Sequence, residues 1–140
     1  MHILVTNDDG ITAPGLLELA KELATLGKVT VLAPDRNWSA AGHTKTMDRP
    51  MRVKAVEVLD GIPAFATDGA PSDCVALAVL GVLEEKVDLV VSGINPNANL
   101  GHDMTYSGTV TAAMEAVIWG LPGIAVSLNG PLHSTTPVDF

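Results

Sequence analysis

Short apolar runs alternate along this chain with segments in which apolar residues recur every three or four positions. The runs are bounded by Gly, Pro, Asn or Asp, as is typical of buried strands in a parallel sheet. These predicted strands cover residues 3–6, 29–33, 88–92 and 124–128. The three- and four-residue spacing predicts helices over 14–26, 72–85 and 107–119. Pro14 suits the first position of a helix, and Ser72 is the predicted cap of the second helix.

A period-two pattern marks the segment between the second strand and the second helix. Apolar and charged residues alternate over 51–58, which predicts a half-exposed edge strand, and 64–66 predicts a short partner strand. No element is predicted for 129–140. Strands that alternate with helices favour right-handed crossovers. The pattern therefore predicts a three-layer α/β/α domain with a mainly parallel, doubly wound sheet and one inserted β-hairpin.

The first apolar run leads directly into two adjacent carboxylates, Asp8 and Asp9. They fall at the carboxyl end of a strand, where open α/β sheets bind ligands. Two like charges side by side repel each other, and removing them from water costs more. A hard divalent cation would offset both costs, so we predict that Asp8 and Asp9 are metal ligands. Ordinary turn and cap chemistry over residues 7–10 is the alternative interpretation.

Two further loops, 35–42 and 93–106, also follow predicted strands, so the three loops should converge on one crevice. Ser39 in the first would add a hydroxyl oxygen, and the Asn-rich second loop would add an amide oxygen. Such an all-oxygen set suits Mg²⁺, Mn²⁺ or Ca²⁺ rather than Zn²⁺. An exposed loop serine without a ligand is the alternative for Ser39.

The start of the third predicted helix offers a place for an anion. Ser107, Gly108 and Thr109 combine free N–H groups, the positive end of the helix dipole and two hydroxyls. Ordinary capping is the alternative for Ser107 and Thr109. A cation on one side and a helix N-terminus on the other would stabilise a transferring phosphoryl group and activate a water.

Four other side chains are candidates for chemistry or for packing. His43 and His102 are candidates for proton transfer, and His102 is favoured because it lies in the Asn-rich loop. Trp38 would stack on a base or sugar, or would cover the core as a lid. Cys74 is predicted to pack in the buried face of the second helix rather than act as a nucleophile.

Composition narrows the class of protein. The chain has 140 residues, enough for one domain with a sizeable core, and 47% of them are hydrophobic. No apolar run reaches the roughly 18 residues of a membrane span, and no signal peptide is visible. Together with a single cysteine, this predicts a cytoplasmic protein without disulfides or a membrane partner. The formal net charge of −8 argues against a nonspecific nucleic-acid binder.

Four segments form a specific combination in their order and spacing: ILVTNDDGITAPG, APDRNWSAAGH, TDGAPSDCVALAV and SGINPNANLGHDMTYSGTVTAAMEA. Together they resemble the SurE family of stationary-phase survival proteins over residues 1–129. The resemblance implies a Rossmann-like fold and a cytoplasmic homodimer or tetramer. It also implies a phosphatase that depends on Mg²⁺ or Mn²⁺ and acts on nucleoside 5′- and 3′-monophosphates, with some activity on short polyphosphate. The implied metal ligands are Asp8, Asp9, Ser39 and Asn95. The implied phosphate contacts are Asn99, Ser107, Gly108 and Thr109.

The chain departs from the family pattern at Asn97 and Ala116, where glycines are usual. Family chains are also much longer, so residues 1–140 are expected to form a single domain that lacks the family's C-terminal portion. Asp8 or Asp9 is predicted to help deprotonate the attacking water, and the sequence does not decide which.

Two other functions are compatible with parts of this pattern. One is a non-catalytic nucleotide- or phosphate-binding module, which the shortened chain makes credible. The other is a haloacid-dehalogenase-like phosphatase, which would form an aspartyl-phosphate. That chemistry needs two aspartates separated by one residue, and Asp8 and Asp9 are adjacent.

Overall fold

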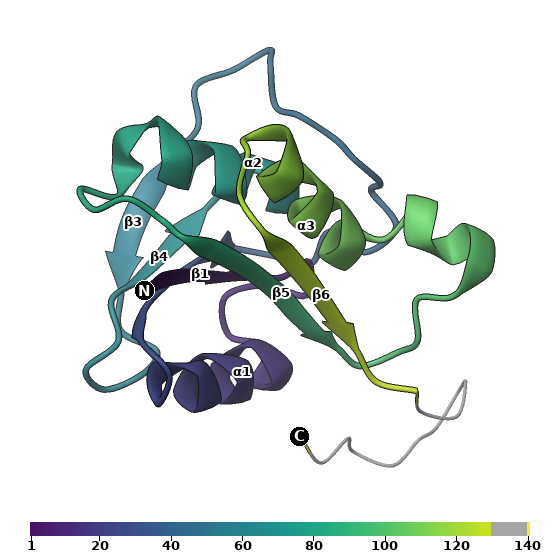
Figure 1. Ribbon diagram of the computed structural model, residues 1–140. Coiled ribbons are helices and arrows are strands. Elements are labelled where there is room, and N and C mark those ends of the chain that lie inside the picture. Colours follow the sequence, from purple (N-terminus) through teal and green to yellow (C-terminus); the bar gives the residue numbers. More distant parts are fainter. Residues whose placement is uncertain (130–139) are drawn as a thin grey trace.

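A computed structural model describes residues 1–129 and 140 of the chain, and its strands form one six-stranded sheet (Figure 1). The order across the sheet is β3-β4-β2-β1-β5-β6. The strands are β1 (His2–Thr6), β2 (Lys28–Pro34), β3 (Val53–Val56), β4 (Ala64–Thr67), β5 (Leu89–Asn95) and β6 (Gly123–Ser127). All neighbouring pairs are parallel except β3 with β4. The predicted mainly parallel sheet is therefore confirmed, and the inserted hairpin lies at its edge.

Helices cover both faces of the sheet, as the three-layer prediction requires (Figure 1). On one face, α1 (Pro14–Ala24) packs on the odd-numbered side chains of β1, Ile3 and Val5. On the other, α2 (Pro71–Leu77) and α3 (Gly108–Ile118) pack on Leu4 and its neighbours. Successive side chains of a strand point to opposite faces, so a central strand covered on both sides reads as an unbroken apolar run.

The second predicted helix needs two corrections. It was expected to extend to about residue 85, but α2 passes into a π-helical turn, η1 (Ala78–Val82), where Gly81 adopts a φ of 110°. The expected cap, Ser72, is wrong as well. Pro71 occupies the first helical position, and the Asp73 carboxylate accepts the Ala70 N–H at 2.9 Å. The Ser72 hydroxyl instead donates to the carbonyl of Thr44.

Other boundaries shift by a few residues. The helix α1 ends at Ala24 and not at residue 26. The strand predicted over 88–92 extends to Asn95, because β5 pairs with β6 as far as Ser127 across an irregularity in register. This extension places Asn95 at the end of a strand instead of inside a loop. Of the segment 129–140, for which no element was predicted, residues 130–139 lie outside the described part of the chain. Among the residues described, no helix has the length and hydropathy needed to cross a bilayer.

Candidate functional site

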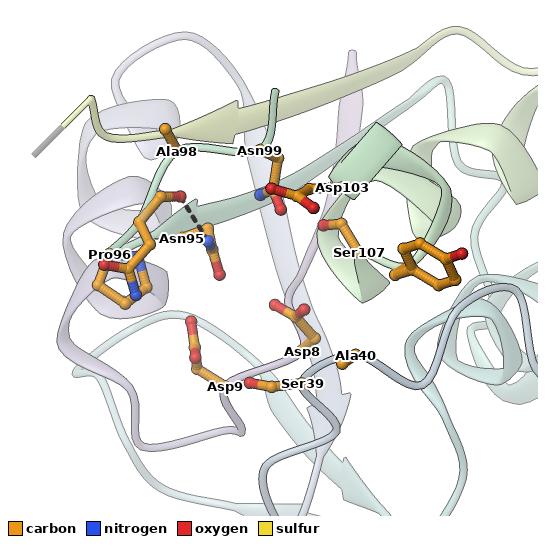
Figure 2. A pocket seen from close by; sticks show the side chains of 12 residues that line it. Asp8, Asp9, Ser39, Ala40, Asn95, Pro96, Ala98, Asn99, Asp103 and Ser107 are labelled. Carbon is orange, nitrogen blue, oxygen red and sulfur yellow. Dashed lines mark hydrogen bonds between the residues drawn. The ribbon is translucent and has the colours of Figure 1, made fainter. Parts of the chain in front are cut away.

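A pocket of about 370 Å³ lies at the carboxyl edge of the sheet, beyond the ends of β1, β2 and β5 (Figure 2). The three loops predicted to converge do meet there. The pocket is lined by Asp8, Asp9, Ser39, Ala40, Asn95, Pro96, Asn97, Ala98, Asn99, Asp103, Tyr106 and Ser107. Six of the eight residues expected at the site belong to this lining, and the other two, Gly108 and Thr109, do not.

Asp8 is buried and held from two sides. Its Oδ1 accepts a hydrogen bond from the Thr109 hydroxyl at 2.6 Å, and its carbonyl accepts the Trp38 N–H at 2.7 Å. The start of α3 approaches it so closely that a Cβ on Gly108 would lie 2.6 Å from the Asp8 Cβ. The fold therefore fixes the position of this carboxylate before any ligand binds.

Asp9 is half-buried and poorly satisfied. Its Oδ2 is buried and finds no hydrogen-bond partner in the described part of the chain, while Asn37 donates to Oδ1 over a long 3.4 Å. Burial, and then the negative charge of Asp8, raise the pKa of Asp9 from its ordinary 3.8 to about 6. A buried carboxylate oxygen without a donor is costly unless something compensates it. The site as built therefore fits a cation.

The remaining oxygen atoms around the two aspartates come from neutral side chains. Figure 2 shows Asp8, Asp9 and Ser39 on one side of the pocket and the Asn95 side chain across from them. The Asn95 amide nitrogen donates to the carbonyl of Asn97 at 2.6 Å, and its oxygen faces the aspartates. Within residues 1–129 and 140, no three His, Cys, Asp or Glu side chains gather as a metal cluster. An oxygen set of this kind suits Mg²⁺ or Mn²⁺ better than Zn²⁺.

The turn at residues 7–10 needs neither aspartate. The Asn7 side chain donates to the Gly10 carbonyl at 3.1 Å and accepts the Gly10 N–H at 3.2 Å. The N-cap of α1 is Ala13, which has no side-chain hydrogen bond. The turn interpretation is thus confirmed for Asn7, but the turn itself uses neither the Asp8 nor the Asp9 carboxylate.

Of the residues expected to contact phosphate, some line the pocket and others do not. Ser107 lines the pocket and also caps α3, since its Oγ accepts the Val110 N–H at 3.2 Å. Asn99 lines the pocket and donates to the Ser127 hydroxyl at 2.7 Å. Thr109 does not line the pocket, and its hydroxyl donates a hydrogen bond to the Asp8 carboxylate. Phosphate binding by these residues stays a prediction.

The other candidate side chains lie away from this pocket. His43 contacts Glu115 at 2.7 Å, and His102 is exposed; neither belongs to the lining. Trp38 is half-buried with the Arg36 guanidinium 4.9 Å from its ring centroid, and it is also outside the lining. Cys74 is fully buried, and burial raises the pKa of its thiol, so the packing prediction is confirmed.

Sequence reasoning missed Tyr106. This ring lines the pocket and is 62% exposed, and no other lining residue is aromatic. Its place directly before the cap residue Ser107, at the ligand-binding edge, was the available signal. Asn97 does not adopt the left-handed conformation expected of a glycine replacement; among the described non-glycine residues only Ala40 does, with a φ of 60°.

Comparison with known proteins identifies close relatives. The family model described as survival protein SurE matches residues 3–139. The protein named 5′-nucleotidase SurE from Herpetosiphon aurantiacus is 59% identical over 91% of this chain and 50% of its own length. The protein of the same name from Geobacter sulfurreducens is 56% identical over 96% of this chain and 50% of its own.

A solved structure agrees with the fold. The crystal structure of SurE protein from Aquifex aeolicus superposes with a TM-score of 0.83 at 44% identity, over 96% of this chain and 54% of that one. The chain spans about half the length of the curated relatives it matches.

Proposed function

The chain belongs to the SurE family, and from this membership and the oxygen-lined pocket we propose that it is a divalent-metal-dependent phosphohydrolase. Its proposed substrates are nucleoside 5′- and 3′-monophosphates, with short polyphosphate as a further substrate. The observation that carries the proposal is the buried Asp9 oxygen, which lacks a donor and lies beside a second carboxylate in the pocket. The substrate class is supported by the name 5′-nucleotidase that the relatives carry.

The metal, Mg²⁺ or Mn²⁺, would be held by Asp8, Asp9, Ser39 and Asn95. When bound, it supplies positive charge that stabilises a phosphoryl group under attack by water. The chain's own contribution is to hold these four oxygens in place. Thr109 fixes Asp8 through its hydroxyl, and the hydrogen bond from Asn95 to Asn97 turns the Asn95 oxygen inward.

The phosphate would lie between the aspartates and the start of α3. There Ser107 and the first N–H groups of the helix offer donors at the positive end of the helix dipole. Asn99 adds an amide from the facing loop. These groups bind and orient the phosphate so that water attacks phosphorus in line with the leaving oxygen.

Asp9 is better placed than Asp8 to accept the proton of the attacking water. The Asp8 Oδ1 is occupied by Thr109, whereas the Asp9 Oδ2 has no donor in the described residues.

The test is phosphate release from a panel of nucleoside 5′- and 3′-monophosphates and short polyphosphates, with Mg²⁺ or Mn²⁺ added to metal-stripped protein. Asp8→Asn should lower turnover by about 10²- to 10³-fold or more, because it removes a charge that the transition state depends on. Asp60→Asn, at an exposed surface position, serves as the control and should leave turnover unchanged.

Three results would contradict the proposal in different ways. If Asp8→Asn turned over substrate as fast as the wild type, the predicted metal site would have no part in the reaction. Nucleotide binding by calorimetry without any phosphate release would favour the non-catalytic binding module. A trapped aspartyl-phosphate would favour the haloacid-dehalogenase-like mechanism.

A further inference from the structure

Glu115 is a buried carboxylate of α3 that takes no part in lining the pocket. Its side chain is 3% exposed and accepts three hydrogen bonds of 2.7 Å. The donors are His43 Nε2, Lys45 Nζ and Trp119 Nε1. Burial alone raises the pKa of Glu115, but the hydrogen bonds from Lys45, His43 and Trp119 outweigh it, so the pKa lies below its usual value. Because a carboxylate only accepts, Nε2 of His43 must carry a proton.

Two of these three donors belong to the segment 35–46, which we call the Ser39 loop. Ser39 itself is exposed near the middle of the loop. On either side of it the backbone is tied to the site: the Trp38 N–H donates to the Asp8 carbonyl at 2.7 Å, and the Gly42 N–H donates to the Tyr106 carbonyl at 2.9 Å. The exposed Ser39 hydroxyl therefore belongs to a loop whose backbone is hydrogen-bonded to the site on both sides of Ser39.

The far end of the Ser39 loop is anchored to buried acids. Beyond the two contacts with Glu115, Thr46 donates its hydroxyl to the Asp73 carboxylate at 2.7 Å. If the loop detached, Glu115 would remain buried without the charge of Lys45 and without the hydrogen bond from His43. Removing one partner of a buried pair is strongly unfavourable. The loop is thus held in one arrangement whether or not a ligand is bound.

One helix therefore organises both sides of the site. At its start, α3 holds Asp8 through Thr109, and two turns later it holds the Ser39 loop through Glu115. Resting on the proposed function, in which Ser39 is a metal ligand, we propose that Glu115 is a positioning residue that preorganises the Ser39 hydroxyl for the metal. Its carboxylate acts through His43 and Lys45 and contacts neither metal nor substrate.

The first test is independent of metal and activity. In Glu115→Gln, hydrogen exchange at the amides of Trp38 and Gly42 should rise about tenfold or more, since docking of the loop is weakened. Exchange in β1 should stay unchanged. His43→Asn provides a second variant with the same expected pattern, and Glu18→Gln, an exposed glutamate of α1 paired with Lys21, is the control. The proposal would be overturned if hydrogen exchange at Trp38 and Gly42 stayed at the wild-type rate in Glu115→Gln, or if exchange in β1 rose by the same factor.

The second test measures Mn²⁺ affinity by calorimetry. Glu115→Gln should weaken binding by about 10- to 100-fold, the range seen when groups that orient ligands are removed. In a Ser39→Ala background the same change should weaken binding by less than about threefold, because both act through one ligand. Equal affinities of wild type and Glu115→Gln, or additive effects, would overturn the role of Glu115. A wild type that binds no Mn²⁺ would instead overturn the proposed metal site, and this inference with it.

Discussion

At the scale of single residues, Asp8 and Asp9 are neighbours with opposite surroundings. Asp8 is buried, hydrogen-bonded to Thr109 and backed by Gly108. Asp9 is half-buried, with a raised pKa and an oxygen that lacks a donor among the described residues. Both residues lie in the turn after β1 and both line the pocket, but only Asp8 has its carboxylate held by a strong hydrogen bond.

The raised pKa of Asp9 gives a pH prediction with a definite sign. A folded-state pKa of about 6 against an ordinary 3.8 means that the folded chain binds the proton more tightly than the unfolded chain. The contribution of Asp9 to the thermal stability of metal-free protein should therefore decrease as the pH rises from about 4 to about 6. Mn²⁺ should restore stability above about pH 6 and progressively less below it, because there a proton competes.

Thermal unfolding with and without Mn²⁺ across this pH range measures the effect. Asp9→Asn is the matched variant. As the pH rises from about 4 to about 6, metal-free wild type should lose stability relative to Asp9→Asn, and Mn²⁺ should stabilise the wild type but not the variant. A difference in stability between the two proteins that does not change with pH would contradict the environment described for Asp9.

Tyr106 should govern the preference for a nucleobase. Its exposed ring in the pocket wall is a platform on which a base can stack, and stacking of this kind is worth about 1–3 kcal/mol. Tyr106→Ala should therefore raise KM for nucleoside monophosphates by about 5- to 150-fold, with little change for ribose 5-phosphate, which has no base. Tyr106→Phe is the control and should keep the wild-type KM. An equal rise in KM for both substrates would show that the ring does not act by stacking on the base.

At the scale of elements, the first turn of α3 is the most tightly fitted part of the site. Gly108 has no room for a side chain, because a Cβ there would approach both Asp8 and the ring of Pro71. Gly108→Ala should push the helix start away from Asp8. We expect a loss of about 1–3 kcal/mol in the free energy of unfolding.

Gly108→Ala should also lower turnover, because displacement of the helix start moves both Thr109 and Ser107. The comparison is Glu18→Gln, at an exposed side chain of α1, which should alter neither quantity. Chemical denaturation and phosphate release measure the two effects. Full stability and full turnover in Gly108→Ala would show that the helix start is not constrained in this way.

The elements that the sequence predicted best are those whose pattern is local. Unbroken apolar runs identified the central strands, and alternation identified the edge hairpin. One error came from a partner distant in sequence, because the extension of β5 to Asn95 depends on pairing with β6. The other was local: Pro71 sets the helix start, and the Asp73 carboxylate rather than Ser72 satisfies the Ala70 N–H.

The same limit applies to the site. Asp8, Asp9, Ser39 and the Asn-rich loop were predicted because strand ends share one edge of the sheet, and the pocket does bring them together. The contacts that hold these residues in place could not be predicted. The bond between Thr109 and Asp8 joins residues 101 positions apart, and the bond between His43 and Glu115 joins residues 72 apart.

At the scale of the whole molecule, α3 and β6 present an apolar surface. Exposed fractions of 48–70% are found for Met114, Val117, Ile118 and Ile124. Exposed apolar side chains on neighbouring elements are a common feature of interaction sites. Together with the homodimer or tetramer expected from the family resemblance, this surface suggests self-association of the 140-residue chain.

Light scattering tests this expectation. The chain should have a mass above that of its monomer, and Ile118→Lys should shift it toward the monomer because a charge would be buried on association. Glu18→Lys, on the opposite helix layer, controls for the added charge. A monomer at all concentrations tested would contradict the expected homo-oligomer.

The direction of β1 has a practical consequence. The strand runs from His2 to Thr6, so its end at the pocket and the exposed Met1 lie at opposite edges of the sheet (Figure 1). Five residues of strand separate them by roughly 16 Å. A tag, dye or surface tether attached ahead of Met1 would therefore point away from the mouth of the pocket, and immobilised protein would keep that mouth open to nucleotide in solution.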